Sequence, residues 1–199
     1  MSAHSNRFNL NFNRVKGLLK LFNQTRTGKR RTNVLETDLL RATVVFLHSS
    51  MEDYLRGVII EHFLNKDSCD LKDITLPHTS NGYGPKFTLS ELVPYKDKTI
   101  SELIEQSVKT HMQKASFGNT GLIISWLKRV GIHLKTSDIN LASIDEMTQR
   151  RHKIVHEADL NQNFGRGNHR TSPITVSQAK GWMDSVNELI TAVERTSPP

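Results

Sequence analysis

Apolar residues recur at steps of three and four over most of the chain, which is the spacing of amphipathic helices. Residues 33–65 contain no proline and one glycine, and they are apolar on several sides, so the pattern predicts a long central helix there. Shorter helices are predicted over residues 98–115, 118–132, 143–159 and 175–196. In residues 6–25 one helical stripe comprises Phe8, Phe12, Val15, Leu18, Leu19 and Phe22.

Local signals set the ends of several of these helices. Thr99 or Ser101 is a suitable cap for the first of the shorter helices, and Gly131 ends the next one. Ser143 and Glu146 have the spacing of a capping box at the start of the 143–159 helix. The last helix is expected to bury a stripe of Val176, Ala179, Met183, Val186, Ile190 and Val193.

Two stretches interrupt the helical pattern. Residues 27–33 form a basic turn, and residues 66–98 are rich in turn-forming residues, so we expect an irregular insertion with a short helix over 88–93. The tail 197–199 should fray. Because strand-like alternation is scarce, the chain is predicted to be one all-α domain over 1–199, a bundle of about five or six helices with neighbours mostly antiparallel.

Charge and composition narrow the range of partners. The formal net charge of +7 favours a polyanionic partner, such as nucleic acid, an acidic protein or a membrane surface, without choosing between them. A single cysteine, Cys69, excludes an intramolecular disulfide and favours a reducing compartment. The first 17 residues lack the apolar region of a signal peptide, and no apolar run approaches the length of a membrane span. We therefore expect a cytoplasmic protein that does not enter the membrane.

The segment QRRHKIVHEAD, residues 149–159, concentrates cationic and titratable side chains within about two helical turns. One interpretation is an ordinary solvated helix face, since lysine and arginine usually lie outside. That interpretation explains Arg150 and Lys153 better than it explains two histidines beside Ile154 and Val155, a pair expected to anchor the helix.

A metal site is the second interpretation of this segment. His152 and His156 are four residues apart and share a helix face, and Asp159 follows three residues later. However, Lys153 stands where a zinc-binding HExxH helix carries its glutamate, and a third ligand would have to come from elsewhere, for instance His48 or Glu52. The prediction is that the chain uses no metal and no cofactor.

RNA cleavage is the third interpretation. Histidine exchanges protons near neutral pH, and arginine offers a permanently charged fork of donors to phosphoryl oxygens. Arg151 and His156 supply this pair, but residues five apart on a helix differ in direction by about 140°. A cleft where two copies of the helix meet at a two-fold axis would bring such side chains together. The spacing alone is weak, because Arg56 and His62 form a similar pair one residue longer.

The wider context, RRHKIVHEAD on a late helix and VVFLHSSMEDYLRGVI on a long early one, resembles the HEPN superfamily, and within it the RiboL-PSP-HEPN group. The resemblance covers roughly residues 35–195, with strong motifs only in these two stretches. It implies an all-α homodimer and a metal-independent endoribonuclease of toxin–antitoxin, abortive-infection or CRISPR-linked defence systems. The family signature, an arginine followed by a polar residue and then a histidine, maps onto Arg151, His152 and His156.

The resemblance also implies roles for these residues. Arg151 would bind the scissile phosphate, and His156 would act as general base or acid at the 2′-hydroxyl. His152 would orient His156 or contact RNA, unless it is an ordinary surface histidine. Family members often carry a polar or acidic residue on the early helix, for which Glu52 is the first candidate, placed to orient Arg151, and Asp53 the second. An ordinary surface carboxylate is the alternative for Glu52.

Further basic residues are candidates for RNA contact. Arg150 and Lys153 flank the motif, and Arg166, His169 and Arg170 lie with Phe164 in the following loop, where arginines and an aromatic ring suit single-stranded RNA. A solvated loop is the alternative, and the cluster at 27–31 indicates only a phosphate-friendly surface.

Two functions follow as hypotheses. The first is an endoribonuclease that cleaves RNA through its 2′-hydroxyl as a toxin or defence effector. The second is a non-catalytic dimeric module that binds RNA or a partner protein, such as an antitoxin, in a toxin–antitoxin or antiviral system.

Overall fold

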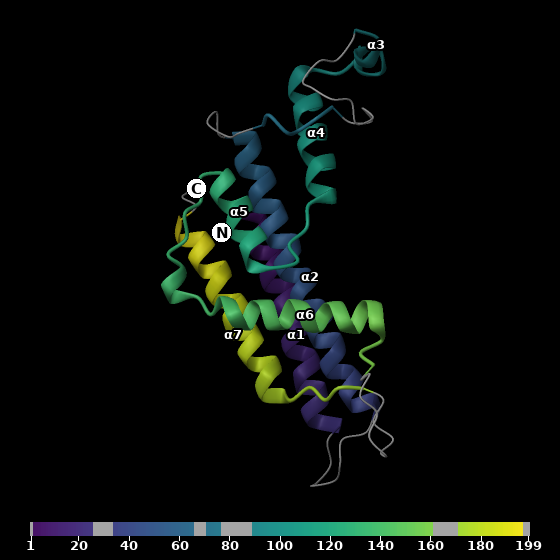
Figure 1. Ribbon diagram of the computed structural model, residues 1–199, viewed down its shortest axis with the longest axis vertical. Coiled ribbons are helices and arrows are strands. Elements are labelled where there is room, and N and C mark those ends of the chain that lie inside the picture. Colours follow the sequence, from purple (N-terminus) through teal and green to yellow (C-terminus); the bar gives the residue numbers. More distant parts are fainter. Residues whose placement is uncertain (1, 26–33, 66–70, 77–88, 161–170, 197–199) are drawn as a thin grey trace.

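The computed structural model describes residues 2–25, 34–65, 71–76, 89–160 and 171–196. Within these ranges the chain is an all-α bundle, as predicted, and its β structure is limited to one isolated bridge between Leu160 and Thr171 (Figure 1). The longer helices are α1 (Ala3–Thr25), α2 (Val34–Asn65), α4 (Ile100–Lys114), α5 (Thr120–Arg129), α6 (Leu141–Glu157) and α7 (Val176–Thr196). Three short pieces complete the described elements: α3 (Leu89–Leu92) and the 3₁₀ turns η1 (Val93–Tyr95) and η2 (Thr136–Asp138).

Helix α2 is the axis of the molecule. It packs along α1 and also contacts α4, α5, α6 and α7, so its apolar residues are buried on several sides, as its sequence predicted. Figure 1 shows α6 lying across the long direction of α1 and α2, where the sequence suggested mostly antiparallel neighbours. This crossing packs one face of α6 against α2, and these two helices form walls of the site described below.

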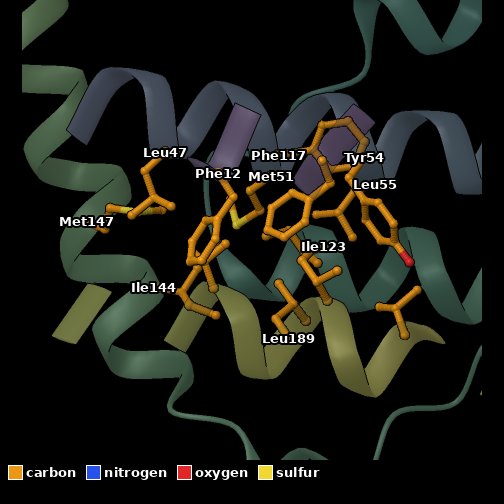
Figure 2. Packing of buried hydrophobic residues seen from close by; sticks show 14 of the residues in the cluster. Phe12, Leu47, Met51, Tyr54, Leu55, Phe117, Ile123, Ile144, Met147 and Leu189 are labelled. Carbon is orange, nitrogen blue, oxygen red and sulfur yellow. The ribbon is translucent and has the colours of Figure 1, made fainter. Parts of the chain in front are cut away.

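The core is built from the stripes that the sequence indicated. In α1 the buried apolar residues are those of the predicted stripe except Leu18, which is half-buried, and the rings of Phe8 and Phe12 stack at 5.3 Å. Helix α7 buries Trp182 and Leu189 in addition to most of its predicted stripe. Figure 2 shows side chains of several helices, including Leu47 of α2, Ile144 of α6 and Leu189 of α7, gathered in one cluster.

Helix ends follow local capping chemistry, with one correction. Thr99 caps α4 in a full capping box with Glu102, as one of the two predicted caps. Helix α6 begins earlier than predicted, because the side chain of Asn140 accepts the Ser143 N–H at 3.1 Å and takes the cap position. The capping box expected from Ser143 and Glu146 is therefore wrong, and the Glu146 carboxylate instead accepts the indole N–H of Trp182.

The described part of the 66–98 region contains the irregular residues 71–76 and the short elements α3 and η1, close to the helix expected at 88–93. In none of the described ranges does a helix combine the length and the apolar content needed to cross a bilayer.

Candidate functional site

Helix α6 brings most of the motif segment across α2 and ends at Glu157, one residue after His156. In the first half of α6 the side chains of Ile144 and Met147 are buried in the core. Further along, Ile154 is half-buried and packs against the same core. Val155, expected to anchor the helix with Ile154, is instead 47% exposed, because the next position along a helix points about 100° away. The helix ends in the left-handed conformation at Ala158, with φ of 50°.

A buried ion-pair network holds this helix end, although Arg150 Nε and Asp159 Oδ1 have no hydrogen-bond partner among the described residues. Arg41 Nε and Arg150 Nη2 both donate to Oδ2 of Asp159, at 2.7 and 2.8 Å, and both guanidinium groups also donate to the carbonyl oxygen of Ser172. The Asp159 side chain is 1% exposed, so removing one of its arginines would leave a buried charge without a partner, which costs far more than breaking a surface pair. Arg150, a candidate for RNA contact, therefore points into the protein and fixes the turn after α6.

The neighbouring residue, Arg151, lies in a different environment. It lines a hollow of about 370 Å³ between α2, α6 and the segment that joins α4 to α5. Of the predicted site residues, the hollow also brings together Glu52, His152 and Lys153. The complete lining consists of His48, Glu52, Ser116, Gly118, Thr148, Gln149, Arg151, His152, Lys153 and Glu157. The Arg151 Nε atom is buried and has no hydrogen-bond partner among the described residues.

His48 is the residue of this hollow that sequence reasoning undervalued, since it entered only as a possible metal ligand. Its side chain is 4% exposed, and neither ring nitrogen has a hydrogen-bond partner in the described structure. Burial lowers the pKa of His48 to about 4, with a further contribution from the positive charge of Arg151. His48 is therefore neutral at pH 7. A histidine in the apolar run VVFLHSS, one turn before Glu52, was the available signal.

The two acidic candidates on α2 lie in different places. Glu52 lines the hollow, with its carboxylate 3.6 Å from His48 Nδ1 and 3.6 Å from Arg56 Nη2. Its expected partner, Arg151, is not among these contacts. Asp53 points away from the hollow and accepts a hydrogen bond from Arg7 Nε of α1 at 2.5 Å. Adjacent residues of a helix diverge by about 100°, so only one of the two carboxylates can face α6.

The two motif histidines are neighbours at the exposed end of α6. The rings of His152 and His156 lie 4.7 Å apart between centroids, with 43° between their planes. His152 lines the hollow, whereas His156 is exposed and is not among the lining residues. In one chain, therefore, Arg151 and His156 do not both face the hollow, in keeping with their angular separation on the helix.

A comparison with protein-family models identifies the family of the chain. The RiboL-PSP-HEPN model matches residues 9–196, from the first half of α1 to the end of α7. The chain belongs to this HEPN family. No curated protein and no solved structure matches the chain. Because the match covers nearly the whole sequence, both walls of the hollow, α2 and α6, lie within the HEPN domain.

The rival pair Arg56 and His62 on α2 of this HEPN domain has structural contacts. Arg56 Nε donates to the carbonyl oxygen of Met112 at 2.9 Å and Nη2 donates to that of Ala115 at 3.3 Å, and its guanidinium lies over the Phe117 ring. Arg56 thus caps the end of α4, while His62 is buried. Spacing alone did not distinguish this pair from Arg151 and His156, but their surroundings do.

The ligand set considered for a metal is not assembled. The Asp159 carboxylate is held by two arginines, away from the two histidines that it would have joined. The described residues contain no group of three or more histidine, cysteine, aspartate or glutamate side chains placed to hold a metal ion. The remaining candidates for RNA contact, Arg166, His169 and Arg170 with the adjacent Phe164, and the cluster at 27–31, lie outside the described residues.

Proposed function

We propose that this HEPN-family chain is a metal-independent endoribonuclease that cleaves RNA through the 2′-hydroxyl and acts as a toxin or defence effector. The observation that carries the proposal is the environment of Arg151. Its guanidinium lines a hollow, and in the described part of the chain no carboxylate lies within ion-pairing distance of it. An arginine held at a cavity without a counterion is suited to bind a phosphate of the substrate.

The chemistry needs one proton acceptor, one proton donor and one cation. In the proposed reaction His156 removes the proton of the 2′-hydroxyl, and the 2′-oxygen attacks the adjacent phosphorus. The bond to the 5′-oxygen breaks, and this oxygen takes a proton from water. Arg151 binds the phosphoryl oxygens and stabilises the charge that develops on them. The products are a 2′,3′-cyclic phosphate and a free 5′-hydroxyl.

A homodimer completes this proposal. His156 lies at the exposed end of α6, outside the hollow that Arg151 lines in the same chain. In a two-fold dimer built across this face, His156 of one copy approaches Arg151 of the other, so each cleft combines groups from both copies. Lys153, which lines the hollow from an exposed position, adds a second cation for the RNA backbone, and His152 orients its neighbour His156.

The experiment is an RNA cleavage assay in EDTA. We expect a product that ends in a 2′,3′-cyclic phosphate, and resistance of a substrate with a 2′-deoxy nucleotide at the scissile position. His156→Ala should lower the rate by about 10²–10⁴-fold, the range for loss of an acid–base group. The matched control is His133→Ala, which removes a histidine outside the hollow. Cleavage that is the same in wild type and in His156→Ala would exclude the assignment.

A second function is favoured by the position of His156 outside the hollow. If the two copies do not bring Arg151 and His156 together, the chain is a non-catalytic module that binds RNA or a partner protein such as an antitoxin. This alternative predicts that the purified dimer binds RNA or its partner without cleavage. Light scattering establishes the oligomeric state, and a paired antitoxin gene or a defence operon beside the gene identifies the partner.

A further inference from the structure

The hollow between α2 and α6 is surrounded by polar atoms that lack partners. They are both ring nitrogens of His48, the hydroxyl of Thr148 and Nε of Arg151, each buried and without a hydrogen bond among the described residues. A buried polar group left unsatisfied costs about 1–3 kcal/mol, so such atoms are rare and need an explanation. Several of them around one cavity make that cavity suited to a polar ligand.

The lining carries charges of both signs. Arg151 and Lys153 supply cations, whereas Glu52 and Glu157 supply carboxylates. A run of RNA phosphates would be repelled by the two carboxylates, so the cavity is not a simple phosphate channel. Its volume of about 370 Å³ lies in the range of small-ligand pockets. A single nucleotide fits this description, because its phosphate is an anion and its base edge carries hydrogen-bond donors.

The carboxylate of Glu52 can accept a hydrogen bond from the edge of a nucleobase. Its two ion pairs, with His48 and Arg56, are each 3.6 Å long, beyond hydrogen-bonding distance, and none of the hydrogen bonds of the described residues ends on it. Gln149, exposed beside it in the lining, has an amide that is likewise not used by the described residues. Carboxylates accept from the amino group of cytosine, and glutamine amides pair with adenine. Proteins read single-stranded RNA through such edges of unstacked bases.

We propose that the hollow is a base-selective pocket that takes one unstacked nucleobase with an exocyclic amino group, next to the phosphate bound by Arg151. Glu52 and Gln149 accept hydrogen bonds from the amino group, and the neutral imidazole of His48 and the Thr148 hydroxyl pair with the remaining edge. Uracil is disfavoured, because it turns a carbonyl oxygen toward the Glu52 carboxylate where adenine and cytosine turn an amino group. This inference rests on the proposed function for RNA as the ligand.

The experiment measures binding by the full-length chain, without cleavage. The probes are fluorescent 2′-O-methyl hexanucleotides of uracil in which one central position is adenine, cytosine, guanine or uracil, and fluorescence anisotropy gives each Kd. We expect the hexamer with adenine or cytosine to bind about 10-fold more tightly than the all-uracil hexamer, since a site that hydrogen-bonds a group rejects a ligand that lacks it. Glu52→Gln adds an amide donor for a carbonyl oxygen and should reduce this ratio to below about 2-fold.

The control is Glu105→Gln, which removes the same charge from an exposed carboxylate of α4 that pairs with Lys109. It should preserve the ratio of the wild type. Equal affinities for all four hexamers, binding of none of them, or a ratio that Glu52→Gln leaves unchanged would overturn the pocket. Failure of the nuclease proposal looks different: base-selective binding without cleavage of RNA in EDTA retains the pocket and excludes catalysis, whereas cleavage without base preference retains the nuclease and excludes the pocket.

Discussion

Arg150 and Arg151 are adjacent in sequence, yet they belong to two regions of opposite character. Arg150 enters a buried network in which Asp159 accepts from two arginines and the Ser172 carbonyl oxygen accepts from both. Arg151 borders a hollow whose buried polar atoms lack partners in the described structure. Both regions keep unpartnered buried atoms, Arg150 Nε and Asp159 Oδ1 in the network and Arg151 Nε at the hollow, but the Asp159 carboxylate already binds two arginines, whereas Arg151 borders a cavity that a ligand can enter. The contrast indicates which of two similar arginines acts in function.

The largest expected effect separates these two arginines. Arg151→Ala should lower RNA cleavage by about 10²–10³-fold, as loss of a group that stabilises transition-state charge does, and should change the free energy of unfolding by less than about 0.5 kcal/mol. Arg150→Ala should do the reverse, destabilising the fold by about 2–3 kcal/mol because it breaks hydrogen bonds to a buried carboxylate.

The measurements are urea unfolding and cleavage rates for both variants, with cleavage assayed well below the unfolding midpoint. The comparison breaks down if Arg150→Ala loses cleavage while it stays as stable as wild type, or if Arg151→Ala is the less stable of the two.

The stability of the protein should depend on pH through His48, which lines the hollow. Burial and the charge of Arg151 lower the folded-state pKa of His48 to about 4, from the ordinary histidine value of 6.5. Between these values the unfolded chain binds a proton that the folded chain does not, so stability rises with pH across this window and is lost as pH falls toward 4. The contribution is about 3 kcal/mol, since each pKa unit corresponds to about 1.4 kcal/mol.

Chemical unfolding of wild type and His48→Gln at a series of pH values between 4 and 7 measures this contribution. The glutamine variant should show a flatter dependence, because it cannot titrate. Parallel curves for the two proteins would mean that His48 is solvated and that the hollow is less closed than its burial indicates.

The smallest effect concerns the turn at Ala158, next to Asp159 and its ion pairs with two arginines. Ala158 adopts a left-handed conformation with φ of 50°, which disfavours a residue with a side chain. Ala158→Gly should therefore stabilise the protein by about 0.5–1 kcal/mol, with part of the relief offset by the greater freedom of glycine in the unfolded chain. Thermal unfolding measures the change. Ala142→Gly, at a regular position of α6, should instead lose up to about 1 kcal/mol. A loss at both positions would contradict the left-handed turn.

The sequence predicted several features directly, because they depend on local chemistry. Periodicity located the helices, and the turn-rich composition located the irregular region between α2 and α4. The two motif stretches pointed to the HEPN superfamily and the RiboL-PSP-HEPN group, which the family match confirms. The cap of α6 was wrong because Asn140 competes with Ser143 three residues later, and both residue types can serve.

The sequence could not predict which side chains of different helices contact one another. Periodicity gives the direction of a side chain around its own helix, but not what lies opposite it. Glu52 was the first candidate and Asp53 the second, and only the packing placed Glu52 at the hollow and Asp53 beside Arg7 of α1. His48 was named only as a possible metal ligand, and its position beside Arg151 at the hollow became evident only from the packing of α6 against α2.

By itself the sequence determined the helices, the family and the segment in which the chemistry is expected, since these depend on residue type and spacing along the chain. The tertiary structure alone decided that Arg150 is bound to Asp159 while Arg151 faces a cavity with His48. The physical reason is that hydrogen-bond saturation is a property of three-dimensional neighbours: Asp159 and Arg41 are 118 residues apart in sequence and meet only when α2 and the end of α6 pack together.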